Sequence, residues 1–297
     1  MKSRGYVEPF RVTDGSRFRM KDFDPGETLG LKAKEEAQRD LEEGIARLSV
    51  LQDKLYAQDR WALLLIFQAM DAAGKDSTIK HVMSGVNPAG CQVYSFKSPS
   101  SEELNHDFLW RTTRCLPERG HIGIFNRSYY EEVLIVRVHP ELLASERMPP
   151  ALVGKDIWKQ RYSDINAFEH YLARNGIITR KFFLHVSKKE QRKRFLKRLE
   201  EQEKNWKFSP SDVAERTRWD DYMRVYEEMI QNTSSERAPW HIVPADHKWV
   251  TRLVVAGAVV ETLEELNLAY PKVDAEKHKA LDAARKALEK EGENNKG

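Results

Sequence analysis

The sequence predicts an α/β fold in which a mostly parallel sheet is flanked by helices. One observation is the continuous apolar run Ala62–Phe67, which has the length and composition of a strand buried on both faces. A second is that short apolar segments alternate with longer segments of helical periodicity, as in repeated strand–helix–strand units. Sheets of this kind bind ligands at the carboxyl ends of their strands, so functional residues are expected there.

The elements expected along the chain follow from this alternation. The predicted strands are 62–67, 92–96, 122–125, 179–186 and 241–244. The predicted helices are 31–58, 75–84, 101–114, 128–137, 155–173, 188–203, 210–232 and 248–269. We therefore expect an extended N-terminal arm at 1–30, a main domain at 31–271, and a charged C-terminal helix or tail at 272–297.

Composition excludes several classes of protein. Among 297 residues, 49 Lys and Arg against 46 Asp and Glu give a net charge of +3, which argues against a globally basic nucleic-acid-binding protein. The longest apolar runs, 61–67 and 253–260, are shorter than the about 18 residues of a membrane span. The first residues lack the apolar stretch of a secretion signal. Two cysteines exclude a disulfide framework. Together these four observations predict a cytoplasmic protein without nucleic-acid or membrane partners.

The segment Ala69–Ser77 follows the first strand, opens a helix and predicts a phosphate-binding loop. Backbone N–H groups at such a position point at phosphate oxygens, and Lys75 adds a positive charge. The phosphate-binding residues expected here are Ala72, Ala73, Gly74, Asp76 and Ser77. The alternative is an ordinary glycine turn followed by a solvated lysine.

This loop departs from the pattern G-x-x-x-x-G-K-[ST] at two positions. Ala69 replaces the first glycine, and Asp76 replaces the Ser or Thr whose hydroxyl usually holds magnesium. That hydroxyl is therefore displaced to Ser77 or lost. Asp71 is the candidate replacement, either as an oxygen ligand of the metal or as the group that orients the phosphoryl acceptor.

A second cluster follows the strand 122–125. P-loop enzymes place a magnesium-binding carboxylate at such a strand end, and here Asn126 occupies that place. The neighbouring Arg127 can bind two phosphate oxygens through its guanidinium. Taken alone, Asn126 also fits a helix N-cap and Arg127 a surface ion pair.

The segment after the strand 179–186 is strongly basic. Between residues 187 and 207, nine basic side chains outnumber four acidic ones. Arg194 and Arg198 lie four residues apart and share one helix face, whereas Phe195 and Leu199 share another that can anchor the helix. A solvated helix is the usual meaning of such a run. Next to a phosphate loop, however, it predicts an arginine-bearing lid over the charge that develops in phosphoryl transfer.

Together, Ala69–Ser77, Phe125–Tyr130, Gly85–Pro88 and this lid resemble the polyphosphate kinase 2 family over about residues 5–270. The resemblance implies a thymidylate-kinase-type P-loop fold of three layers, with a central parallel five-stranded sheet and a helical lid at about 187–208. It also implies a magnesium-dependent transfer of terminal phosphate from inorganic polyphosphate to nucleotides, with Mn²⁺ as an alternative metal.

The run Asn126–Ser128, followed by Glu131–Leu134, resembles the subgroup that accepts both nucleoside mono- and diphosphates. Many family members carry an aspartate in the place of Asn126. Asp71, together with Glu131 or Glu132, is therefore expected to hold the magnesium.

We expect a direct, in-line transfer without a phosphohistidine. The expected catalytic residues are Asp71, Lys75, Arg127, Arg194 and Arg198. The expected nucleotide-binding residues are Asn87, Asn126, Trp206 and Lys207. A basic track for the polyphosphate chain is expected to include Lys80, Lys97, Arg111, Arg114 and Arg137, each of which could equally be a surface charge.

Two other functions stay open at this point. One is an ATP-dependent nucleoside monophosphate kinase on the same scaffold, which would ignore polyphosphate as donor. The other is a non-enzymatic module that binds polyanions such as RNA through residues 188–207. The partners expected of a polyphosphate-dependent nucleotide kinase are polyphosphate and adenine or guanine nucleotides. The resemblance also implies a homo-oligomer, a dimer or tetramer, for which 31–58 and 253–260 are candidate surfaces.

Overall fold

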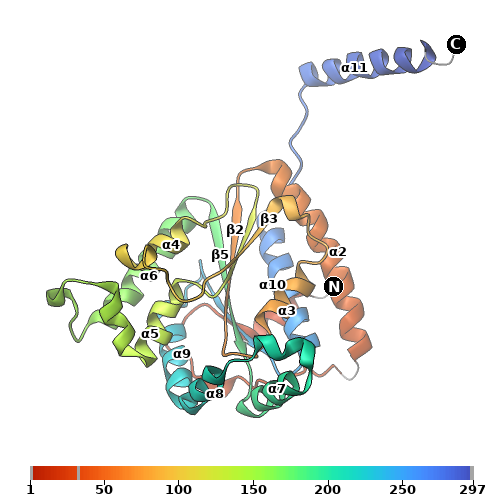
Figure 1. Cartoon of the computed structure of the whole chain (residues 1–297). Helices are drawn as coiled ribbons and strands as arrows, with labels where there is room; N and C mark the ends of the chain where they lie inside the picture. The colour runs from red at the N-terminus through yellow and green to blue at the C-terminus, as the bar shows by residue number, and fades with distance from the viewer. Residues whose placement is uncertain (1–2, 32–33, 295–297) are drawn as a thin grey trace.

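The computed structural model describes residues 3–31 and 34–294 and places a six-stranded sheet at the centre of the molecule (Figure 1). The strands are β1 (Arg11–Val12), β2 (Ala62–Gln68), β3 (Cys91–Ser95), β4 (Ile122–Asn126), β5 (Ile177–His185) and β6 (Trp240–Pro244). Their order is β1-β6-β5-β2-β4-β3. The five predicted strands are all present and parallel to their neighbours, and β1 adds a short antiparallel edge to β6.

Helices cover both faces of this sheet. They are α1 (Ser3–Val7), α2 (Lys34–Gln58), α3 (Lys75–Val82), α4 (Trp110–Thr113), α5 (Ile135–Val138), α6 (Ile157–Arg174), α7 (Lys188–Glu200), α8 (Pro210–Thr217), α9 (Trp219–Thr233), α10 (Lys248–Glu265) and α11 (Ala275–Asn294). In Figure 1, α2, α3 and α10 lie on one side of the sheet and α4, α5, α6 and α9 on the other. α7 and α8 lie apart from both layers, at the end of the sheet where β5 leads into α7.

Short 3₁₀ segments join many of these elements. They are η1 (Glu8–Phe10), η2 (Met20–Asp22), η3 (Pro88–Gly90), η4 (Glu103–Asn105), η5 (Tyr129–Val133), η6 (Pro140–Glu146), η7 (Pro150–Leu152) and η8 (Gln202–Lys207).

The hydrophobic core lies on both faces of β2, whose seven residues are all buried because helices cover each side. On one face α10 packs against α2, and Leu48, Leu51 and Leu55 of α2 are at most 3% exposed. The apolar run 253–260 of α10 is buried as well. The expectation that this run is a self-association surface is therefore wrong, because α2 and the sheet already cover it.

The N-terminal arm is more ordered than its lack of periodicity predicts. α1 packs on α10, and β1 pairs with β6. A Cβ at Gly15 would lie 2.3 Å from the carbonyl oxygen of Gln231, so only glycine allows the arm to pass this close to α9. The arm is thus partly helical and partly paired, rather than wholly extended.

Three predicted helices are interrupted. In 101–114 only η4 and α4 form, because Asp107 accepts a hydrogen bond from the backbone of Leu109 and starts a new turn. The stretch 128–137 is divided into η5 and α5, and 210–232 is divided at Arg218 between α8 and α9. In each case the local periodicity is compatible with one continuous helix, and the tertiary structure overrides it.

A buried polar cluster connects η5 to β5 and α6. Lys181 on β5 is fully buried, and its ammonium group lies 2.7 Å from the carboxylate of Glu169 on α6. It also donates to the hydroxyl of Tyr130 and to the carbonyl of Thr233. The hydroxyls of Tyr129 and Tyr130 donate to the other carboxylate oxygen of Glu169. These bonds draw two η5 side chains inward, which accounts for the irregular backbone of that segment.

The C-terminal segment ends in α11, which projects beyond the rest of the molecule in Figure 1. It is helical, as expected, and the described residues from Pro271 to Glu291 are exposed. Cys91 and Cys115 are free thiols. Among the described helices, none combines the length and apolar character that crossing a bilayer requires.

Candidate active site

The predicted phosphate loop lies at the carboxyl end of β2, where the chain turns into α3. Ala72 and Gly74 both have positive φ angles, of 62° and 109°. This conformation curls the backbone so that successive N–H groups can converge on an anion. The N–H groups that open α3 have no partner inside the helix and add to the same site. This backbone conformation is compatible with the predicted phosphate loop, whose binding role stays a prediction.

Lys75 is the first residue of α3 and is almost completely buried. Its ammonium group donates to the carbonyl oxygen of Ala69, 2.9 Å away, at the start of the loop. Burial lowers the pKa of Lys75, and the neighbouring Arg127 lowers it further, whereas Asp71, Glu131 and Asp76 oppose the shift. A phosphate in the loop would add negative charge beside this lysine and stabilise its protonated form.

Arg127 lies directly after β4 and next to the loop because β4 pairs in parallel with β2, with Asn126 opposite Phe67. Its backbone has a φ of 65°, and its side chain reaches Asp71 beyond the end of β2. The guanidinium donates to the carboxylate of Asp71 at 3.1 Å and lies 3.8 Å from that of Glu131. The carboxylates of Glu131 and Asp71 raise the pKa of Arg127, so this side chain stays charged.

Two of the three positions that depart from the usual P-loop patterns, Asp76 and Asn126, contact each other. The amide of Asn126 donates to the carboxylate of Asp76 at 2.8 Å. If residue 126 were an aspartate, two carboxylates would face each other at this place. The departure at one position is therefore chemically matched by the departure at the other, which the sequence alone did not indicate.

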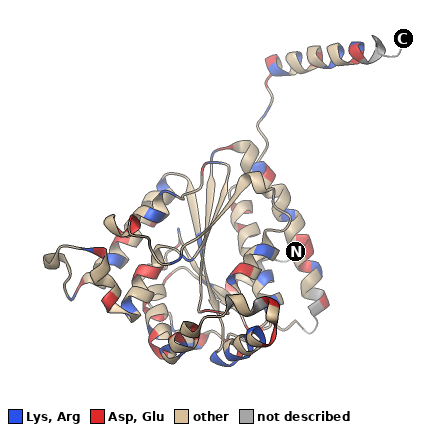
Figure 2. Ribbon diagram, viewed as in Figure 1, with Lys and Arg blue, Asp and Glu red and all other residues tan. Residues whose placement is uncertain are grey.

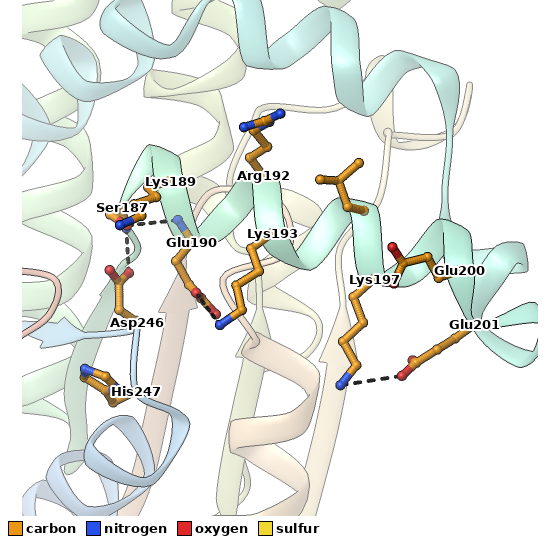
Figure 3. Close-up of a pocket in the computed structure, with 11 residues that line it drawn as sticks. Ser187, Lys189, Glu190, Arg192, Lys193, Lys197, Glu200, Glu201, Asp246 and His247 are labelled. Carbon is orange, nitrogen blue, oxygen red and sulfur yellow. Dashed lines mark hydrogen bonds and ion pairs between the residues drawn. The ribbon is translucent and has the colours of Figure 1, made fainter.

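The predicted lid begins with α7, and basic segments follow one another along it in Figure 2. Ser187 caps the helix by accepting a hydrogen bond from the backbone of Glu190. Figure 3 shows Asp246 beside Ser187, Lys193 paired with Glu190, and Lys197 paired with Glu201. Neighbouring acids thus neutralise part of the basic excess.

The two arginines of the predicted lid differ in their surroundings. Arg194 does not point into open space: its guanidinium donates to the loop carbonyls of Ala72 and Ala73 and to those of Ala245 and Asp246. The guanidinium of Arg198 instead lies 5.6 Å from the ring centre of Phe195. Phe195 is buried as predicted, but Leu199 is 47% exposed, so the expected apolar anchor holds only at its first residue.

Several predicted residues have structural partners elsewhere. Glu132 lies in a buried ion-pair network with Arg111 and Arg161, which does not fit its predicted role as a magnesium ligand. Arg137 donates to Tyr162 and pairs with Glu228, and Arg111 donates to the carbonyl of Lys97. Neither of these two arginines fits an open polyphosphate track, because other protein groups already satisfy their guanidiniums.

The remaining candidates lie at the surface. Lys80, Lys97 and Arg114 are exposed, and Arg114 stacks on Trp110. Asn87 caps η3 by accepting a hydrogen bond from the backbone of Ala89. Trp206 is 78% exposed, whereas the side chain of Lys207 lies outside the described residues. Ser77 donates to the carbonyl of Gly74 and is only partly buried. Binding roles for these residues stay predictions.

The residues near the loop fit a magnesium ion that keeps most of its ligands from water and phosphate. Within the described residues no group of three or more His, Cys, Asp or Glu side chains could hold a metal. Asp71, 38% exposed, and Glu131 nevertheless offer one or two carboxylates beside the loop. Mg²⁺ in phosphoryl-transfer sites typically takes one or two carboxylates together with waters and phosphate oxygens. The donor set therefore suits that ion.

Sequence reasoning missed Gln191, Arg216 and Asp246. Gln191 donates to the carbonyl of Asp71 at 3.0 Å and accepts from Arg216 at 2.7 Å. A neutral glutamine in a basic helix carries no chemical signal. Its helical spacing from Arg194, which places the two on one face, could have drawn attention to it.

Known proteins of one family are similar to this chain. The family model described as Polyphosphate kinase 2 matches residues 31–271. An ADP-polyphosphate phosphotransferase of Rhodopseudomonas palustris is 54% identical over 95% of this chain and 98% of its own length. An AMP/ADP-polyphosphate phosphotransferase of Meiothermus ruber is 42% identical over 93% and 99%. The crystal structure of Polyphosphate Kinase 2 from Arthrobacter aurescens TC1 superposes with a TM-score of 0.84 at 40% identity, covering 93% of this chain and 96% of that one.

Proposed function

Because this chain belongs to the polyphosphate kinase 2 family, we propose that it transfers the terminal phosphate of inorganic polyphosphate to nucleoside diphosphates and monophosphates. One observation carries the proposal: the phosphate loop with Lys75 and the guanidinium of Arg127 meet at the ends of two adjacent parallel strands. Phosphoryl transfer requires little more from a protein than positioning and positive charge around the moving group.

The proposed reaction is a direct, in-line displacement. A terminal phosphate oxygen of the nucleotide attacks the terminal phosphorus of the polyphosphate chain and forms a new anhydride bond. The bond between that phosphorus and the bridging oxygen breaks, so the nucleotide gains one phosphate and the chain loses one. One anhydride bond is formed and one is broken, so the free-energy change of the reaction is close to zero. Substrate concentrations therefore set its direction.

Each loop residue has a distinct part in this scheme. Lys75 and Arg127 offset the negative charge of the transferring phosphoryl group from two sides. Asp71 orients the attacking nucleotide or, with Glu131, binds Mg²⁺. Bound Mg²⁺ supplies further neutralisation of the phosphate oxygens. Arg194 already donates to loop carbonyls, whereas within the described part of the chain no loop carbonyl accepts a hydrogen bond from Arg198, so Arg198 is the freer of the two to approach a bound phosphate.

The similarity to a relative named for both AMP and ADP supports a dual acceptor range, as does the sequence around Asn126. We expect adenine and guanine nucleotides as substrates, a homo-oligomeric assembly and a cytoplasmic location. Light scattering of the purified protein measures the subunit number directly.

The decisive experiment compares initial rates with AMP and ADP when polyphosphate is the sole donor and Mg²⁺ is present. The proposal requires ATP to form from ADP, and ADP to form from AMP. Phosphorylation of AMP by ATP, with polyphosphate inactive, would instead establish a nucleoside monophosphate kinase. Salt-dependent RNA binding without any phosphoryl transfer would establish a polyanion-binding module.

A further inference from the structure

The side of the phosphate loop that faces α7 presents backbone carbonyl oxygens, and two α7 side chains bind three of them in succession. Gln191 donates to the carbonyl of Asp71 at 3.0 Å. Arg194 donates to those of Ala72 and Ala73 at 3.1 and 2.7 Å. Gln191 is 1% exposed, so its bond to the loop is shielded from competing water.

These contacts determine where the loop's N–H groups point. In a planar trans peptide the carbonyl oxygen and the following N–H point in opposite directions. Holding the carbonyls of Asp71 and Ala73 toward α7 therefore directs the N–H groups of Ala72 and Gly74 away from it. The N–H of Ala73 instead donates to Met70 and closes the turn. Within residues 3–31 and 34–294, the N–H groups of Ala72 and Gly74 have no backbone acceptor, which leaves them available to a phosphate.

The orientation of Gln191 is itself fixed by a neighbour. Its Oε1 accepts a hydrogen bond from Arg216 on α8 at 2.7 Å. A guanidinium only donates, so the oxygen of the amide must face Arg216 and the NH₂ group must face the loop. The bond between Arg216 and Gln191 thus sets which group reaches Asp71.

We propose that Gln191 is a positioning residue for phosphoryl transfer, which joins Arg216 on α8 to the backbone of Asp71 and so orients the phosphate loop. Gln191 acts on the backbone of the same residue whose carboxylate contacts Arg127. Its effect therefore reaches both the N–H groups of the loop and the side-chain pair beside them. The catalytic part of this inference rests on the proposed function, whereas the anion-binding part does not.

The test compares variants that remove one or both of these bonds. Gln191→Met keeps the size of the side chain and removes both, whereas Gln191→Glu keeps the acceptor for Arg216 and loses the donor to Asp71. The matched control is Gln231→Met, because Gln231 donates in the same way to a backbone carbonyl, that of Phe18, at 2.9 Å. For each full-length protein we would measure the urea midpoint, kcat and KM, and the affinity for tripolyphosphate by calorimetry.

The expected result is a loss of about 10- to 100-fold in kcat/KM for both Gln191 variants, since a small misplacement of a reacting group has effects of this size. Affinity for tripolyphosphate should fall as well, while the urea midpoint changes no more than in Gln231→Met. Arg216→Met should act in the same direction. The double variant Gln191→Met/Arg216→Met should be no worse than Gln191→Met, because both substitutions break one connection.

The outcomes separate this inference from the proposed function. An active wild-type protein whose Gln191 variants match Gln231→Met in rate and tripolyphosphate affinity would overturn the inference. A wild-type protein that lacks phosphotransfer, but binds tripolyphosphate in a Gln191-dependent way, would overturn the proposed function and support the positioning role. If Gln191→Met does not fold, Gln191→Glu and Arg216→Met decide by the same two measurements.

Discussion

Two clusters of charged residues lie close to η5 but differ in how their charges are satisfied. We call Lys181, Glu169, Tyr129 and Tyr130 the interior cluster. Lys181 is 0% and Glu169 4% exposed, and the three donors of the ammonium group have three protein acceptors. We call Asp71, Lys75, Arg127 and Glu131 the loop cluster. There Arg127 and Asp71 are 36% and 38% exposed and share one hydrogen bond.

The contrast separates charges that hold the fold together from charges that await a ligand. In the interior cluster every strong donor is matched within the protein, as a buried charge requires. In the loop cluster all four side chains are charged, and Arg127 and Asp71 stay more than one third exposed at the strand ends, where a phosphate can bind the guanidinium of Arg127. The clusters should therefore respond in opposite ways to substitution, one in stability and the other in rate.

The largest expected effect is a loss of stability on Lys181→Met. Removing one partner of a buried ion pair leaves the carboxylate of Glu169 unpaired, which costs about 3–5 kcal/mol. Urea unfolding monitored by circular dichroism measures this change. The double variant Lys181→Met/Glu169→Gln should recover part of the loss. An unchanged urea midpoint in Lys181→Met would show that the interior cluster does not stabilise the fold.

The next effect in size is a loss of activity on Lys75→Met. Removing a group that stabilises developing charge should lower kcat by about 10²- to 10³-fold. The free energy of unfolding should change little, because the buried ammonium also carries a desolvation cost. Initial rates with ADP and polyphosphate, set beside the urea midpoint, test both statements. Near-normal rates would remove Lys75 from the active site.

Acid should lower the stability of the fold through two buried histidines. Burial lowers the pKa of His241 to about 3 and that of His185 to about 4. The ring nitrogen Nδ1 of His241 lies 3.2 Å from the carbonyl oxygen of Lys181 in the interior cluster. Below pH 6.5 the unfolded chain binds protons that the folded chain excludes, so stability falls as pH decreases, by about 1.4 kcal/mol per pH unit for each histidine.

Urea titrations at pH 7 and pH 5 measure this slope, and His241→Gln should reduce it. The contribution of Glu131 in the loop cluster to this slope has the opposite sign. Burial raises the pKa of Glu131, so as pH decreases the folded chain binds this proton before the unfolded chain does. A slope that is the same in His241→Gln and in the wild type would exclude His241 as its source.

The smallest expected effect is that of Arg127→Lys. A lysine keeps the charge but cannot bind two oxygens in parallel, so kcat/KM should fall about 10-fold. Because the pair with Asp71 is partly exposed, stability should change by less than about 1 kcal/mol. Steady-state kinetics and urea unfolding of the same preparation check both values. A larger change in stability than in rate would assign Arg127 to the fold rather than to the site.

Much of the fold was predictable because strand positions depend on local apolar runs. The five predicted strands lie within two residues of the observed ones at either end. The division of 128–137 into η5 and α5 was not predictable, because it depends on Glu169 and Lys181, which follow in the chain by tens of residues. Likewise, the basic character of 187–207 predicted charge near the loop but not which side chains hold its carbonyls.

The sequence by itself determined the loop after β2, the lysine that opens α3 and the arginine after β4, because each depends on residues adjacent in the chain. Only the tertiary structure decided which charges remain available. It pairs Glu132 and Arg137 with other residues, turns Arg194 to backbone carbonyls and brings Gln191 to Asp71, 120 positions away. The physical reason is that pairing depends on the order of strands in the sheet, which places distant segments side by side.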